Sequence, residues 1–150
     1  MVKPYTISMY EKYANGSSVK AGADILNGSF GVINNNGVFV NANRATHVAL
    51  QVGKGDENHT DFVIPSGADL RVFDLRDWVG KCLQVSPVHI KYDSGQSYAS
   101  ITKGTLLSSN NDGALVINNT ANNDAGNVYL KVIEKIEFDG NGVLCEICVA

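Results

Sequence analysis

The 150-residue sequence contains three prolines, one tryptophan and no apolar run of the eighteen or more residues that a membrane helix needs. The first residues, Met1 to Ile7, lack the apolar core of a secretion signal. Lysine and arginine number 12 against 15 aspartates and glutamates, so the formal net charge is −3. Nucleic-acid binding depends on basic side chains that displace counterions. The composition therefore predicts a soluble protein made in the cytoplasm, with no nucleic-acid partner and no membrane partner.

Cysteine is also scarce, and its three copies are an odd number. Cys145 and Cys148 have a C-x-x-C spacing, but they fall in a strand-like run, where positions three apart point to opposite faces. This geometry disfavours a shared metal ion or a mutual disulfide. We therefore expect these two cysteines, and Cys82, to act as small buried hydrophobic residues. No metal and no cofactor is predicted.

The short motifs of common enzymes are missing as well: there is no nucleophile elbow, P-loop, dinucleotide-binding glycine motif or zinc-protease motif. The histidines at positions 47, 59 and 89 are scattered singly. Cys82 and His89 would form a nucleophile pair only if the fold brought them together. The sequence thus predicts no catalytic residue and a protein that is not an enzyme.

What the sequence does contain is a repeat. Residues 25–40 (ILNGSFGVINNNGVFV) align without a gap with residues 101–116 (ITKGTLLSSNNDGALV). Asn-Gly and Asp-Gly are the dipeptides best suited to a two-residue type I′ hairpin, which needs positive φ at both central residues. Each copy is therefore predicted to be a strand, a two-residue turn and a strand. The predicted turn residues are Gly28, Asn36 and Gly37 in the first copy and Gly104, Asp112 and Gly113 in the second.

The match continues beyond the hairpins. After a slip of four residues, residues 48–52 lie over 128–132, and a weaker echo pairs 70–73 with 145–148. The first pair of runs alternates apolar and outward positions, as half-buried strands do. We therefore predict an all-β fold, an antiparallel barrel or sandwich built from two similar units by internal duplication. One unit alone would bury a smaller fraction of its surface than the whole chain, so the halves are expected to share a core.

Four regions follow from this pattern: residues 1–18 form a strand or an extended arm, 19–73 the first unit, 74–90 a connector and 91–150 the second unit. In the connector, Asp74 can cap a short helix near residues 74–80 that Gly80 ends. Trp78 lies on its apolar face and is a candidate partner contact, because tryptophan leads the residues that dominate interfaces. We favour the alternative, in which Trp78 fills the space between the two units.

The N-terminal region is rich in tyrosine and methionine, which are enriched in interface cores. If this region is an arm rather than an internal strand, its candidate partner contacts are Tyr5, Met9, Tyr10 and Tyr13.

Several segments share the layout of a known kind of protein: residues 101–107 (ITKGTLL), 112–116, 128–132, 142–149 (GVLCEICV), and the connector segments 67–75 and 78–81. Together they resemble small β-rich virion proteins of tailed bacteriophages, the capsid decoration or cement type. The doubling is a departure, because a single-barrel decoration protein would not need the first copy.

The resemblance implies a non-enzymatic viral structural protein, assembled in the host cytoplasm and located on the capsid surface of the virion. It would bind the outside of an assembled shell and stabilise it by mass action. Its expected partner is the major capsid protein, and a homo-oligomer of the chain itself is a further option.

Two other functions stay open. Asparagine-rich loops on a β-scaffold can bind sugars through their amides, which would make the chain a carbohydrate- or cell-surface-binding module. Such a module would show an exposed aromatic side chain beside Asn and Asp in one shallow cleft. A small pseudo-symmetric β-barrel enzyme is the third option and would need histidines or carboxylates gathered in one pocket.

Overall fold

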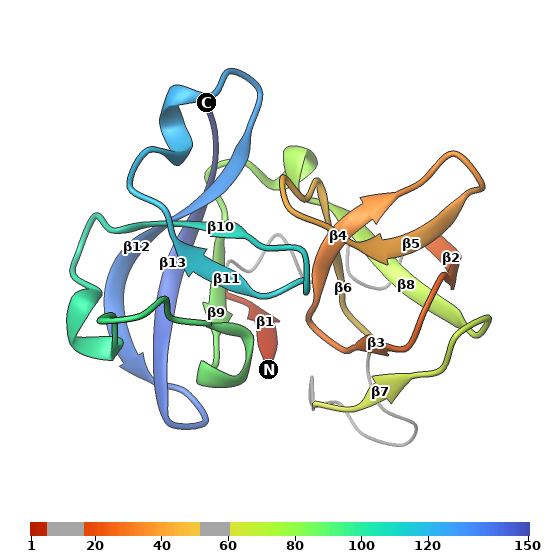
Figure 1. Cartoon of the computed structure of the whole chain (residues 1–150), viewed down its shortest axis with the longest axis horizontal. Helices are drawn as coiled ribbons and strands as arrows, with labels where there is room; N and C mark the ends of the chain where they lie inside the picture. The colour runs from red at the N-terminus through yellow and green to blue at the C-terminus, as the bar shows by residue number, and fades with distance from the viewer. Residues whose placement is uncertain (6–16, 52–60) are drawn as a thin grey trace.

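The computed structural model describes residues 1–5, 17–51 and 61–150, and its regular structure is made of strands (Figure 1). The strands form a closed barrel, a six-stranded antiparallel sheet and a two-stranded ribbon. The helical segments of the described residues are short 3-10 turns, and none is a regular α-helix. The prediction of an all-β fold is confirmed. Three predicted contact residues, Met9, Tyr10 and Tyr13, lie outside the described residues.

The first half of the chain forms the barrel. Its strands follow the order β2, β5, β4, β6 and β8, and β8 pairs with β2 to close the circle. Every pairing is antiparallel except that of β2 with β5. The strands are β2 (Ser17–Ala21), β4 (Phe30–Ile33), β5 (Val38–Asn41), β6 (His47–Ala49) and β8 (Asp69–Asp74). Closure gives every strand of the barrel a neighbour on both sides, so none presents a free edge.

The second half forms the sheet, which the N-terminal strand β1 joins at one edge. The order is β1, β9, β13, β12, β10 and β11. A parallel bridge between Ile90 and Leu115 places the chain just after β9 beside β11, so the sheet curls back on itself. Its strands are β1 (Val2–Pro4), β9 (Cys82–Val85), β10 (Leu106–Ser109), β11 (Leu115–Ile117), β12 (Val128–Glu137) and β13 (Asn141–Val149).

The remaining elements are a two-stranded ribbon and four 3-10 turns among the described residues. The ribbon pairs β3 (Ile25–Leu26) with β7 (Val63–Ile64). The 3-10 turns are η1 (Leu75–Trp78), η2 (Pro87–His89), η3 (Tyr98–Ser100) and η4 (Ala121–Asn123). The helix predicted near residues 74–80 is thus only the turn η1, with Asp74 as its N-cap accepting a hydrogen bond from Arg76 N at 2.9 Å. Its buried residues, Leu75 and Trp78, are three apart, which matches the three-residue period of a 3-10 turn.

The strand order of the barrel recurs in the sheet. Around the barrel the order β5, β4, β6, β8 corresponds to β11, β10, β12, β13 in the sheet. In both bodies a parallel pairing closes the circle. In the barrel β2 pairs with β5, and in the sheet the segment at Ile90 pairs with β11. The two halves therefore pair their strands by the same scheme.

Backbone hydrogen bonds give the alignment of the two halves. In the barrel Gly28 N donates to Ala49 O at 2.7 Å, and in the sheet Gly104 N donates to Val132 O at 2.8 Å. Ala49 is therefore equivalent to Val132, and the predicted alignment, which placed it over Tyr129, is wrong by three residues. The additional residues fall in the loop between β11 and β12 that carries η4.

The two hairpin turns have one conformation, and it is not the predicted one. Gly37 N donates to Asn34 O at 2.9 Å, and Asn34 N donates to Val38 O at 2.9 Å. Gly37 has a φ of 75°, but Asn36 does not have positive φ. This is a type I turn followed by a left-handed glycine, a three-residue loop. The predicted two-residue type I′ turn is therefore wrong.

The second hairpin repeats this turn, and an asparagine side chain explains it. Gly113 N donates to Asn110 O at 3.1 Å, and Gly113 has a φ of 78°, whereas Asp112 does not have positive φ. Asn110 Oδ1 accepts from Asp112 N at 2.9 Å, as Asn34 Oδ1 accepts from Asn36 N at 2.9 Å. The side chain holds the middle of the loop, so only the glycine has to adopt positive φ.

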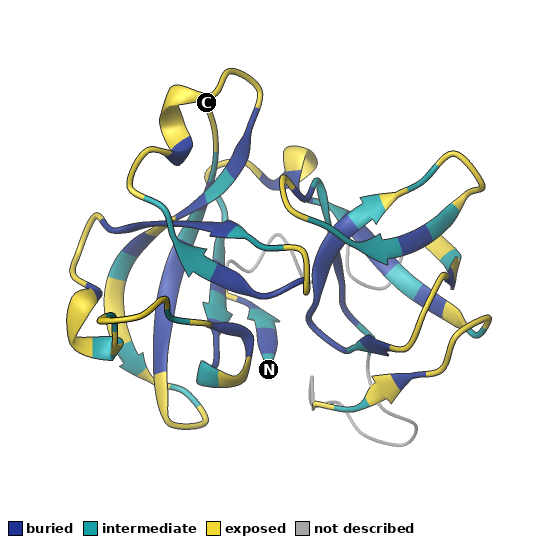
Figure 2. Cartoon of the chain, in the orientation of Figure 1, coloured by how far each residue is buried: buried dark blue, intermediate teal, exposed yellow. Residues whose placement is uncertain are grey.

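The main hydrophobic core receives side chains from both halves. Figure 2 shows buried residues, in dark blue, along the strands of both halves. The core includes Phe30, Val48, Leu50 and Phe73 from the barrel and Leu83, Leu107, Leu130 and Ile147 from the sheet. Trp78 is 2% exposed in this cluster and stacks on Phe73 with ring centroids 4.7 Å apart. The tryptophan thus lies inside the shared core and offers almost no surface to a partner.

Candidate functional site

A hollow of about 380 Å³ lies between the barrel and the sheet, and we call it the groove. Its lining combines apolar side chains with carboxylates from both halves: Leu26, Val63, Val88, Ala114, Asp24 and Asp112. Val63 is 58% exposed and Val88 is 42% exposed. The groove therefore presents apolar surface to solvent between two acidic side chains.

Two short elements hold these apolar residues in place. The ribbon pairs Leu26 directly with Val63, so their side chains stand on the same face. Val88 is the middle residue of η2, which begins with Pro87 after the end of β9. Proline suits the first position of a helical turn because its fixed φ matches the turn and its missing N–H would have no partner there.

The turn between β10 and β11 forms another wall of the groove and packs directly on the barrel. Phe30 N donates to Gly113 O at 2.9 Å, and Asn41 Nδ2 donates to Asp112 O at 2.9 Å. A side chain on Gly113 would meet Asn41, because a Cβ built there lies 2.7 Å from Asn41 Cγ. This glycine therefore serves both the turn and the close approach of the two halves.

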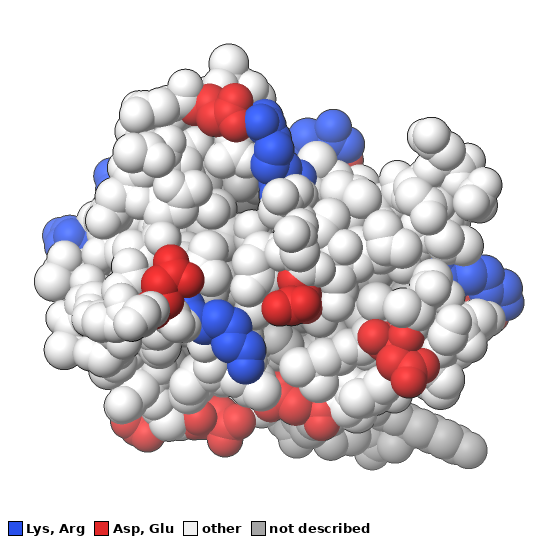
Figure 3. All heavy atoms as spheres, in the orientation of Figure 1, with Lys and Arg blue, Asp and Glu red and all other residues white. Residues whose placement is uncertain are grey.

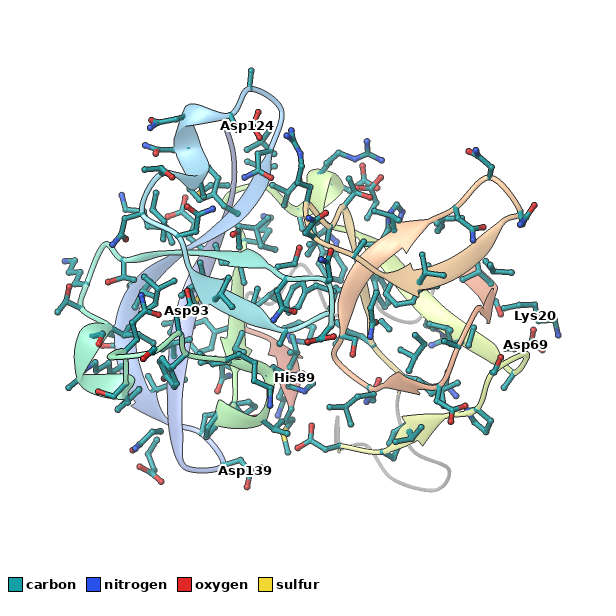
Figure 4. The ribbon with its side chains drawn as sticks, in the orientation of Figure 1. Lys20, Asp69, His89, Asp93, Asp124 and Asp139 are labelled. Carbon is teal, nitrogen blue, oxygen red and sulfur yellow. The ribbon has the colours of Figure 1, made fainter. Side chains whose placement is uncertain are left out.

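His89 lies beside the groove, in the lower middle of Figure 4. Its ring is 2% exposed, and Nε2 lies 3.1 Å from Asp61 Oδ1, a carboxylate that the Met1 ammonium also contacts. Burial lowers the pKa of His89 to about 4, although Asp61 opposes the shift. The imidazole is therefore neutral at pH 7. A Cβ on Gly28 would lie 2.7 Å from the ring, so this glycine allows the histidine to pack closely.

Charge is distributed unevenly on the face shown in Figure 3. Acidic atoms gather mainly along its lower half, and a further acidic group lies at the top beside basic atoms. Among the described residues that line the groove, the charged ones are Asp24 from the barrel half and Asp112 and Lys91 from the sheet half. The described lining of the groove thus carries one more negative than positive charge.

The predicted contact residues occupy different environments. Tyr5 is 55% exposed just after β1, and its N donates to Cys82 O at 2.9 Å. Trp78 is buried, so it cannot supply the exposed aromatic that a carbohydrate module was expected to show. The sequence did not single out Val63 or Val88, because neither belongs to a motif and the groove exists only once the two halves pack.

The three cysteines, all within the described residues, form no disulfide. Cys145 is fully buried, but Cys82 and Cys148 are partly exposed. Expecting burial for those two was wrong, because both occupy outward positions of their alternating strands.

Within residues 1–5, 17–51 and 61–150, no group of three or more histidines, cysteines, aspartates or glutamates could hold a metal ion. No helix in the same ranges is long and apolar enough to cross a membrane. The chain matches no family model, no curated protein and no solved structure. Functional proposals for it therefore rest on its own residues and geometry.

Proposed function

We propose that this chain is a non-enzymatic structural protein of a tailed-phage virion that binds the outer surface of the assembled capsid and stabilises it. The observation that carries the proposal is the groove, where Val63 and Val88 are 58% and 42% exposed beside Leu26. Single exposed apolar residues are normal, but neighbouring ones rimmed by polar groups mark interaction sites. The resemblance to decoration proteins supports the same conclusion.

The groove fits an extended segment of the major capsid protein that carries apolar side chains and a basic residue. Leu26, Val63 and Val88 would cover the apolar side chains, and Asp24 and Asp112 would attract the basic one. Both halves of the chain line the groove, so its shape depends on their packing. Binding there would use the folded protein as one rigid body.

Stabilisation of the shell follows from mass action. A protein that binds only the assembled shell lowers the free energy of that state, by about 2.7 kcal/mol per site when its free concentration is a hundred times Kd. Many sites on one capsid add their effects. No chemical step is needed for this function.

The test mixes the purified chain with capsids of the phage whose genome carries this coding sequence. The chain is expected to co-sediment with the capsids and to raise the temperature at which they release DNA. Val63→Asp and Val88→Asp are each expected to weaken binding by about tenfold or more, because each places a charge in an apolar contact. Val79→Asp is the matched control, since Val79 is 49% exposed and does not line the groove.

Two results would contradict the proposal. The first is wild-type protein that stays in the supernatant with intact capsids. The second is an equal weakening of capsid binding by Val63→Asp and Val79→Asp, which would show that the capsid does not bind at the groove.

We also infer that the two halves arose by internal duplication. The ungapped alignment of residues 25–40 with 101–116, the common turn conformation and the recurring strand order support this origin. An experimental structure tests it, because the backbone of residues 28–41 and 47–49 should superpose on that of residues 104–117 and 130–132. A clearly different path of either segment would oppose the inference.

A further inference from the structure

A second hollow, of about 270 Å³, lies between the loop after β5 and the loop between β11 and β12. We call it the polar pocket, and its lining includes Arg44, Ser108, Ser109, Asn118, Asp124 and Asn127. Asp124 and His89 are far apart in Figure 4, at the upper and lower parts of the molecule. The polar pocket is thus separate from the groove.

An ion pair joins the two halves at this pocket, between Arg44 Nη1 and Asp124 Oδ2. The side chains are 58% and 53% exposed, and exposed pairs of this kind contribute about 0–1 kcal/mol to stability. Arg44 also has a φ of 51°, a left-handed conformation that costs a residue with a side chain on the order of 1 kcal/mol or more. The arginine therefore adds little to folding, which points to a role in binding.

Asn127 adds an unsatisfied polar group to the lining. The residue is 6% exposed, and its Nδ2 donates to Ala121 O at 2.9 Å. Its Oδ1 accepts no hydrogen bond from any residue that the structure describes. A buried acceptor without a partner costs about 1–3 kcal/mol. A ligand hydroxyl would satisfy this one only after the Asn127 side chain turns toward the pocket, because Oδ1 itself is buried.

The other side chains offer both donors and acceptors. Asn118 Nδ2 donates to Ser108 Oγ at 3.1 Å, which leaves the serine hydroxyl hydrogen to donate. Ser109 Oγ accepts from Ala45 N at 2.9 Å. Both serines also line a small adjoining cavity together with Tyr129, a half-buried residue of β12. Hydrogen-bonding groups and an aromatic residue therefore lie in the same region.

We propose that the polar pocket binds a neutral saccharide residue. The charges of Arg44 and Asp124 cancel, so an ionic ligand of either sign would have to break their pair. Amide, hydroxyl, guanidinium and carboxylate groups together match the alternating donors and acceptors of neighbouring sugar hydroxyls. The volume lies just below the usual range for ligand pockets, about 300–1,000 Å³, which suits a single sugar ring. This proposal stands independently of the capsid proposal, because it uses another site.

The experiment probes the full chain with an immobilised array of neutral oligosaccharides. The monosaccharide common to the bound glycans is then titrated and followed by NMR. Asp124→Asn and Arg44→Gly are expected to weaken binding by about tenfold or more, the loss of roughly one charge-assisted hydrogen bond. Both residues are exposed, so the variants should fold. Asn127→Leu is expected to abolish binding if it folds.

Two control variants keep the result specific. Asn122→Ala changes an exposed asparagine of the same loop that does not line the pocket, and Asp69→Asn removes an exposed ion pair of the barrel with Lys20. Both are expected to bind like wild type. The proposal is overturned if no neutral glycan binds, if pocket and control variants bind alike, or if only inorganic phosphate or acetate perturbs the pocket resonances. None of these results bears on capsid binding through the groove.

Discussion

Gly113 and Asn41 approach so closely that a Cβ on the glycine would lie 2.7 Å from Asn41 Cγ. Asn41 Nδ2 also donates to the carbonyl oxygen of Asp112, at 2.9 Å. Gly37 occupies the equivalent position of the first hairpin with nearly the same φ, 75° against 78°, yet its Cβ would have no neighbour within 4 Å. One turn conformation thus serves a solvent-exposed tip in one half and a contact between halves in the other.

This contrast gives a matched pair of variants. Gly37→Ala is expected to lower the free energy of unfolding by about 1 kcal/mol, the cost of a left-handed alanine. Gly113→Ala is expected to lower it by about 3 kcal/mol, because overpacking against Asn41 adds to the same strain. Urea unfolding of both variants measures the difference. Equal losses would show that the packing at Asn41 relaxes without cost.

Gly28 and Gly104 form a second pair, with φ of 96° and 92°. A Cβ on Gly28 would lie 2.7 Å from the His89 ring, whereas Gly104 has nothing within 4 Å. Gly28→Ala should therefore destabilise by about 2 kcal/mol more than Gly104→Ala, which bears only the conformational strain. Thermal unfolding monitored by circular dichroism gives the comparison. Closely similar melting temperatures would argue against the packing of His89 on Gly28.

The buried imidazole makes stability depend on pH. Because burial lowers the pKa of His89 from 6.5 to about 4, the unfolded chain binds a proton on this ring between those values and the folded chain does not. Stability is therefore complete above pH 6.5 and falls as the pH is lowered toward 4, by about 3 kcal/mol in total from this group.

Denaturant unfolding at pH 7.5 and pH 4.5 measures this dependence. His89→Gln should reduce the difference in the free energy of unfolding between the two pH values. His47→Gln should reduce it less, although burial lowers the pKa of His47 as well. If His89→Gln leaves the difference unchanged, other groups cause the acid sensitivity.

The three thiols should differ in reactivity. Burial raises the pKa of the Cys145 thiol, which is fully buried, and also that of the partly exposed Cys148. Iodoacetamide at pH 8 is expected to label Cys82 and Cys148 in the folded protein and Cys145 only after unfolding, since alkylation needs an accessible thiolate. Mass spectrometry of tryptic peptides identifies the labelled sites. Rapid labelling of native Cys145 would contradict its burial.

Besides the all-β class, the sequence correctly predicted local features. Positive φ at Gly37 and Gly113 was predicted from residue type and spacing, and both glycines have it. The type of hairpin was missed because the decisive group is a side chain two residues earlier in the loop, at Asn34 and Asn110, where Oδ1 holds the backbone. Residue preferences at the two central positions could not reveal that contact.

The register and the candidate sites were harder to predict for a different reason. Alternating apolar residues fit more than one alignment, so only hydrogen bonds distinguish Val132 from Tyr129 as the equivalent of Ala49. The groove and the polar pocket both lie between the halves, and their residues come from loops far apart in sequence. The loop between β11 and β12 forms a pocket only together with Arg44 of the other half.

Strand β9 pairs with β1 on one side and with β13 on the other. The first and the last strands of the described chain therefore both pair with β9. During synthesis β1 has no partner until β9 has emerged, and β9 lacks its second partner until β13 follows. At about 5–20 residues per second, that interval lasts on the order of ten seconds. Over that time the edges of the sheet stay open to other chains, so aggregation during translation should begin at β9.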